Sequence, residues 1–176
     1  MATDQARVTQ REFSYAPDAT LMSTTDVHSH IDYANSAFVA VSGYSPEALM
    51  GQPHKMVRHP DMPKQAFADM WQTLKAGDSW TALVKNRRSN GDHYWVRANA
   101  APVRRQGRVV GYLSVRTRAQ PADVAAAEAL YAGFRQGRMR GWRFCQGLVV
   151  RTGALAWLSA GQRLPVAWRL RLGLLG

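Results

Sequence analysis

The sequence predicts an α+β domain in which a five-stranded antiparallel sheet carries short helices on one face. Three observations lead to this prediction. Five segments have strand character, the helix signals before residue 80 lie between the second and third of these segments, and tight turns join the last three. The chain has 176 residues, of which 46% are hydrophobic and 20% charged, and this composition is typical of a globular domain followed by a tail.

The first strands are expected early in the chain. Residues 1–19 are polar and aperiodic, so we expect a loose N-terminal cap. Thr20–Asp26 has the residues of a short strand that ends at a turn, and His30–Ala34 alternates as its hairpin partner would.

Short helices are expected next. Asn35 can cap a helix that Gly43 ends, and Ser45 followed by Pro46 has the residue types that begin a second helix, which Gly51 closes. Residues 52–62 contain two prolines and a third follows, so this stretch is predicted to be irregular.

A longer helix and three strands complete the predicted domain, which we place at residues 20–120. From residue 63 to 76 the apolar residues recur at helical spacing. Residues 80–88, 93–103 and 109–116 are predicted strands; Asn90-Gly91 is a strong hairpin signal between the first two, and residues 105–108 form the second turn. Pro121 begins an alanine-rich linker helix over residues 121–137.

A hollow between the sheet and the helices is a candidate ligand site. Trp80, Ala82, Val84 and Asn86 share one face of their strand, because side chains alternate along a strand. Apolar walls with one amide suit a flat heteroaromatic ligand. The same pattern also fits an ordinary core with Asn86 at its solvent edge.

The positive charge is concentrated in the C-terminal tail. The formal charge of the chain is +11, yet residues 129–176 hold eight arginines and no Asp, Glu or Lys, which leaves residues 1–128 with a net +3. Arg163, Arg169 and Arg171 alternate with leucine, valine and tryptophan, which is typical of a juxtamembrane segment and not of a nucleic-acid patch. We therefore expect residues 138–176 to be a basic juxtamembrane segment, truncated before a membrane anchor. The alternative is a poorly ordered tail.

Other classes of function have little support. Cys145 is the single cysteine, so an intrachain disulfide is excluded, which fits a reducing compartment. We find neither a nucleophile–base arrangement nor a Cys/His spacing typical of a metal site, so the sequence predicts neither an enzyme nor a metal centre.

Several segments together resemble a known family. Leu21–Asp26, Pro53–Pro63, Phe67–Trp71, Val84–Arg88 and Asn90–Asn99 are similar, almost residue for residue, to the PAS sensor domain of bacterial aerotaxis receptors. The resemblance implies a PAS fold, non-covalently bound FAD and a redox-sensing role. It also implies a homodimeric chemotaxis transducer on the cytoplasmic side of the inner membrane, with its signalling domain downstream.

The resemblance also implies which residues bind the cofactor. Arg58 lies between prolines and could reach the FAD phosphates, although it could also be a solvated loop cation. Trp71 and Trp80 could pack on the ring, although a tryptophan on an amphipathic helix is often simply core. Asn86 is expected to hydrogen-bond the ring. The remaining expected pocket residues are His54, His59, Asp61 and, more weakly, Asn35, each of which could instead serve a turn or a cap.

The expected mechanism is reversible electron transfer. Blue-light sensors of similar architecture need a cysteine near the flavin, but their cysteine position aligns with His54 here. An amide can donate or accept, so Asn86 could follow a protonation change on the ring and relay it through residues 80–116 to the helix beyond.

Two alternatives remain. A haem-binding PAS domain would use His54, His59 or His93 as an axial ligand. A ligand-free PAS dimerisation module would be colourless and would expose a large apolar patch.

Overall fold

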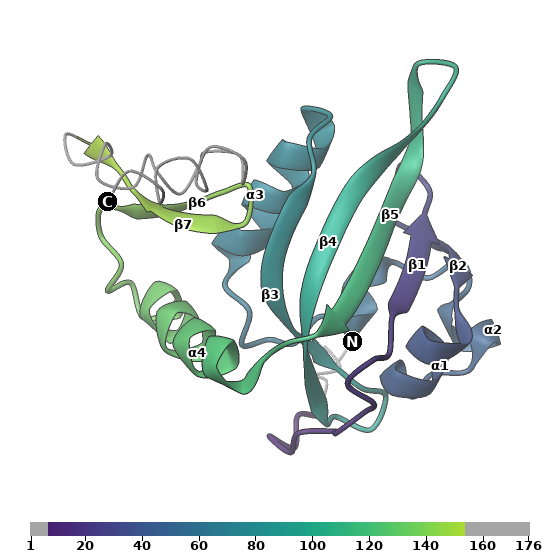
Figure 1. The fold of residues 1–176 in the computed structure, drawn as a ribbon, viewed down its shortest axis with the longest axis horizontal. Coiled ribbons are helices and arrows are strands. Elements are labelled where there is room, and N and C mark those ends of the chain that lie inside the picture. The colour runs from purple at the N-terminus through teal and green to yellow at the C-terminus, as the bar shows by residue number, and fades with distance from the viewer. Residues whose placement is uncertain (1–6, 154–176) are drawn as a thin grey trace, which may run out of the picture.

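The structure, a computed structural model, describes residues 7–153. At its centre is a five-stranded antiparallel sheet with the strand order β2-β1-β5-β4-β3 (Figure 1). The strands are β1 (Leu21–Thr25), β2 (Ile31–Ala34), β3 (Trp80–Arg87), β4 (His93–Arg105) and β5 (Arg108–Arg118). The predicted α+β class and all five predicted strands are confirmed.

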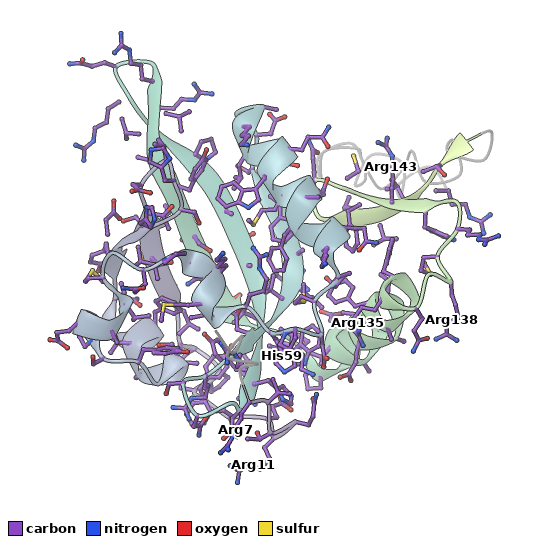
Figure 2. All side chains as sticks on the ribbon, turned by 180° about the vertical axis from the view of Figure 1, so that it is seen from behind. Arg7, Arg11, His59, Arg135, Arg138 and Arg143 are labelled. Atoms are coloured by element: carbon purple, nitrogen blue, oxygen red, sulfur yellow. The ribbon has the colours of Figure 1, made fainter. Side chains whose placement is uncertain are left out.

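Four helical segments cover one face of the sheet. They are α1 (Ser36–Ser42), α2 (Pro46–Leu49), the 3-10 helix η1 (His54–Val57) and α3 (Lys64–Lys75). Figure 2 views the molecule from behind and shows helices in front of the sheet. The predicted boundaries of α1 are confirmed: the Asn35 side chain accepts from the Phe38 amide, and Gly43, with φ 74°, ends the helix.

The irregular loop around η1 returns to the sheet. Arg58 forms an isolated antiparallel bridge with Asn86, and the His59 amide donates to the Lys85 carbonyl over 3.3 Å. These contacts lay the loop along β3, which is an edge strand, and so protect one end of that edge. They also bring Arg58 and Asn86 together from distant parts of the sequence.

Residues 9–13 of the expected N-terminal cap bond to the sheet. The Phe13 amide donates to the His93 carbonyl (2.7 Å), and the His93 amide donates to the Arg11 carbonyl (2.9 Å). The Thr9 amide also bonds the Gly91 carbonyl at 3.0 Å. The segment thus pairs with the start of β4. The backbone groups of β4 need hydrogen-bond partners, and the sequence of β4 does not indicate which residues supply them.

The segment after the sheet folds back beside the β3 edge (Figure 1). It contains α4 (Pro121–Arg135) and a hairpin of β6 (Trp142–Cys145) and β7 (Leu148–Arg151). Tyr131, Phe134 and Phe144 are buried there, and the Tyr131 hydroxyl donates to the Leu83 carbonyl at 2.6 Å. This packing makes α4 and the hairpin part of the folded unit.

The first part of the expected juxtamembrane segment, residues 138–176, contains this hairpin. Its loop residues, Gln146 and Gly147, both have positive φ (54° and 86°), which is the geometry of a tight two-residue hairpin turn. The rest of the expected juxtamembrane segment, including Arg163, Arg169, Arg171 and the expected approach to a membrane anchor, lies outside the described residues. Within residues 7–153, no helix has both the length and the apolar composition needed to cross a bilayer.

Candidate functional site

A hollow opens between the inner face of the sheet and the helices η1 and α3. The empty space in and in front of the hollow, open solvent included, is about 710 Å³. The walls are mainly apolar: η1 and α3 contribute one side and the sheet the other, with Val57, Phe67, Met70, Trp71, Leu74, Trp80, Val84, Ala98 and Ala100. Small alanines on β4 leave the width that a larger side chain would fill, so the hollow suits a flat ligand.

Asn86 brings an unpaired amide to this hollow. Its residue is only 4% exposed and lines the hollow with Trp80 and Val84 from the same strand. The predicted inward face of β3 is therefore confirmed for these three residues, whereas Ala82 is buried on that face without lining the hollow. No hydrogen bond joins the Asn86 side chain to another described residue, so its amide is available to a ligand in the hollow.

Arg116 is a lining residue that the sequence analysis did not identify. It is 2% exposed; one terminal nitrogen, Nη2, donates to Ser23 Oγ (2.5 Å) and contacts His54 Nε2 (2.7 Å). The other terminal nitrogen, Nη1, is buried and has no hydrogen-bond partner among residues 7–153. Among the described residues no carboxylate forms a salt bridge with Arg116.

The buried guanidinium stays charged at neutral pH. Burial lowers the pKa of Arg116 to about 10, and the face of Phe38 lies 4.6 Å from its central carbon. A buried cation without an anionic partner is costly, so this arrangement is typical of a site that receives a polar or negative ligand. Alternation along β5, which puts Ser114 and Arg116 on one face, was the available sequence signal.

His54 supports Arg116 as a neutral base. Burial, followed by the charges of Arg116 and Arg58, lowers the pKa of His54 to about 3. Because arginine can only donate, His54 Nε2 must accept, which assigns the ring proton to Nδ1. The ring also stacks on Phe38 with an interplanar angle of 6°.

Arg58 lines the hollow from the loop after η1. Its guanidinium lies 3.4 Å from the centroid of the Phe67 ring, and its Nε is buried and finds no partner in the part of the chain that the structure describes. Burial lowers the pKa of Arg58, which is the expected direction for a cation partly removed from water. This is a second arginine with unused donor capacity at the same hollow.

Both expected tryptophans line the hollow. Trp71 on α3 meets Tyr112 of β5 edge to face, with ring centroids 5.2 Å apart, so this pair connects the helix to the sheet. Trp80 is 1% exposed, and its indole Nε1 donates to Asp69 at 2.8 Å.

Three other expected site residues do not line the hollow. Asn35 uses its amide to bond the backbone of Thr20, Met22 and Phe38, so it joins β1 to α1. His59 is fully buried, and its Nδ1 accepts from the Asp61 amide at 3.0 Å. The chain turns after Arg58 and takes His59 and Asp61 away from the hollow, which their closeness in sequence to Arg58 could not reveal.

His59 and Asp61 instead belong to a partly buried ionic cluster around Lys85 of β3. Lys85, only 2% exposed, places its Nζ 2.8 Å from Asp61 Oδ2 and 3.2 Å from Gln10 Oε1. Burial and the Lys85 charge lower the pKa of His59 to about 4. Arg135 of α4, labelled beside His59 in Figure 2, bonds the Asp61 carbonyl. The cluster thus joins the N-terminal segment, the loop and α4.

The family description "PAS fold" matches residues 31–116. The aerotaxis receptor of Escherichia coli (strain K12) is 57% identical over 164 residues, which are 93% of this chain and 32% of that receptor. The nitrogen fixation regulatory protein of Klebsiella oxytoca is 34% identical over 95 residues, covering 53% of this chain and 19% of that protein.

Solved structures of light-oxygen-voltage domains share the fold. One light-oxygen-voltage domain superimposes with a TM-score of 0.56 at 22% identity, covering 67% of this chain and 88% of the other. The dark state of the blue-light photoreceptor Aureochrome1 LOV superimposes with a TM-score of 0.55 at 20% identity, covering 66% of this chain and 84% of the other. The chain spans about a third of the aerotaxis receptor that it resembles. The chain therefore has a PAS fold, and it is similar over most of its length to the aerotaxis receptor.

Proposed function

We propose that the hollow binds the flavin ring of non-covalent FAD and that the chain is the redox-sensing input domain of an aerotaxis-type receptor. One observation carries this proposal. Nη1 of Arg116 and Nε of Arg58 are buried polar atoms without partners among the described residues, and both arginines line one mainly apolar hollow together with the side-chain amide of Asn86.

The residues present fit an FAD molecule. The apolar walls of α3 and the sheet suit a flat ring, while Asn86 and Arg116 can hydrogen-bond its polar edge. Arg58 has a spare donor for a phosphate, which an arginine binds well because its planar fork matches phosphate oxygens. The 57% identity to an aerotaxis receptor supports the same assignment.

The chain's own residues would make the hollow respond to redox state. When bound, the flavin would supply reversible uptake of electrons and protons. Asn86 can donate or accept as the ring's hydrogen-bonding character changes. Arg116 only donates and carries a positive charge, so it favours the more electron-rich form of the ligand.

A membrane-linked signalling role extends this proposal. The E. coli relative is a receptor about three times longer than the aligned segment, so a downstream signalling domain would lie in the part outside the alignment. We propose that the full receptor is a homodimer at the cytoplasmic face of the inner membrane, approached through the basic tail. Arg138 and Arg143 lie on the α4 and hairpin side, away from Arg7 and Arg11 (Figure 2).

The haem alternative has less support from the geometry. Of the three candidate axial histidines, His54 lines the hollow, whereas His59 and His93 do not. The His54 Nε2 atom already contacts Arg116, and its ring is stacked on Phe38. A haem ligand needs a free nitrogen directed at the iron.

An absorbance spectrum of the purified chain, taken before and after dithionite, tests the proposal. We expect flavin bands that bleach on reduction and FAD in the supernatant after heating. A Soret band would replace flavin with haem. An absence of chromophore, even after titration with FAD, would leave a PAS interaction module.

A further inference from the structure

Asp69 on α3 receives hydrogen bonds from two segments that are far apart in sequence. Its Oδ2 accepts from the Trp80 indole Nε1 (2.8 Å) and from the Gly147 amide (2.8 Å), while Oδ1 accepts from the Gln146 amide (3.0 Å). Hydrogen bonds to a carboxylate are stronger than those between neutral groups. One side chain therefore holds both the first residue of β3 and the turn of the β6–β7 hairpin.

The two partners of Asp69 belong to different parts of the molecule. Trp80 is a wall of the hollow. Gln146 and Gly147 form the turn of the hairpin, and the chain continues from β7 into the basic C-terminal segment. Asp69 thus links a wall of the hollow to the β6–β7 hairpin, which comes just before the C-terminal part of the chain.

The hairpin turn is held closely at this point. A Cβ on Gly147 would lie 1.9 Å from the Thr81 carbonyl oxygen, and its φ is 86°, so glycine is required by space and by backbone conformation. Phe144 packs on Phe134 of α4, with ring centroids 4.7 Å apart. The hairpin is therefore fixed by α4 at one side and by Asp69 at its turn.

We propose that Asp69 is a positioning residue that transmits changes at the Trp80 ring to the β6–β7 hairpin. Trp80 and Gly147 share one acceptor oxygen, so a shift of the indole changes how strongly that oxygen holds the Gly147 amide. Binding of FAD in the hollow, or reduction of the bound FAD, then alters the fraction of molecules in which the hairpin turn is docked on Asp69. The stimulus in this proposal rests on the proposed function, but the coupling between Trp80 and the hairpin does not.

Hydrogen exchange of the Gln146 and Gly147 amides tests the transmission. The whole chain would be compared without FAD, with oxidised FAD and after dithionite, as wild type, Asp69→Asn and Asp78→Asn. Asp78 is an exposed carboxylate two residues before Trp80 and provides the matched loss of charge.

In the wild type and in Asp78→Asn, exchange at the turn should change at least about threefold between the states of the hollow. In Asp69→Asn, hydrogen exchange of the turn amides should be about tenfold faster than in the wild type, because the charge-assisted hydrogen bond to residue 69 is weakened. It should also be the same without FAD, with oxidised FAD and after dithionite. A turn that responds equally in Asp69→Asn, or that does not respond in a wild type with bound FAD, would overturn the proposal.

A second experiment needs no cofactor. Gly147→Ala should lift the turn from Thr81, whereas Gly141→Ala places the same methyl group at a similar φ of 77° with no atom within 4 Å. In the FAD-free chain, the Trp80 indole N–H resonance should move in Gly147→Ala and stay in place in Gly141→Ala. An unchanged Trp80 resonance with a lifted turn would refute the coupling, even if FAD binding fails for other reasons.

Discussion

Replacing His54 with glutamine should remove part of the acid sensitivity of the fold. The histidine is buried beside Arg116, and its pKa is lowered to about 3 from an ordinary value of 6.5. Protonation would place a second cation next to the guanidinium. Glutamine keeps an acceptor for Arg116 but cannot take up a proton in this range.

The sign and size of the effect follow from proton linkage. Below pH 6.5 the unfolded chain binds a proton at this histidine and the folded chain does not, so stability falls as pH falls toward 3. Each pH unit costs about 1.4 kcal/mol, so between pH 7 and pH 5 the contribution of His54 is a loss of about 2 kcal/mol. His59, whose pKa is lowered to about 4, adds a similar loss that remains in the variant.

Urea unfolding at pH 7 and pH 5 measures this difference. The free energy of unfolding of His54→Gln should fall by about 2 kcal/mol less than that of the wild type between the two pH values. His28→Gln is the matched control, because His28 is an exposed histidine outside the hollow. Equal pH dependence in wild type and His54→Gln would show that His54 is not the buried neutral base inferred here.

Four further substitutions test the site. Arg116→Met should lower FAD affinity at least about tenfold without destabilising the FAD-free chain, because it removes an uncompensated buried charge; parallel FAD titration and thermal unfolding decide this. Asn86→Ala should weaken FAD binding about tenfold by titration, and unchanged affinity would remove Asn86 from the site. Phe38→Ala, at a fully buried position, should cost about 3–5 kcal/mol in urea unfolding, and a cost below about 1 kcal/mol would contradict the packing described. Asp61→Asn should lower the free energy of unfolding by about 1–2 kcal/mol, because Lys85 loses its nearest carboxylate. FAD binding should decrease only in proportion to the fraction of unfolded protein. Loss of FAD binding in a fully folded variant would show that Asp61 belongs to the pocket.

Local chemistry made much of the fold predictable. The Asn35 and Ser45 caps, the stop at Gly43 and the Asn90-Gly91 turn each act within a few residues, so their sequence signals were sufficient. The pairing of residues 9–13 with β4 was not predictable in this way, since it depends on backbone partners more than 75 residues away.

The hairpin shows the limit of pattern analysis most clearly. The strands within residues 142–151 are short and rich in arginine, so the charge pattern of the whole tail indicated a juxtamembrane segment and not a hairpin. Their strands are stabilised by Phe144 packing on α4 and by Asp69 at the turn, both of which are tertiary contacts.

Alternation predicted one wall of the site but not its charge. Trp80, Val84 and Asn86 line the hollow as their spacing on β3 indicates. Arg116 was missed because an arginine on a strand is usually solvated, and its burial depends on the register that pairs it with Ala98 on β4 and Leu21 on β1.

Equilibrium binding of FAD to Ala100→Leu and Ala101→Leu tests the central claim most directly. These neighbours on β4 receive the same added atoms, but only Ala100 lines the hollow. With the fold of both variants checked by circular dichroism, Ala101→Leu should bind FAD like the wild type and Ala100→Leu at least about tenfold more weakly, because its side chain occupies the space for the ring. Wild-type affinity in a folded Ala100→Leu would contradict the account and place the flavin outside this hollow.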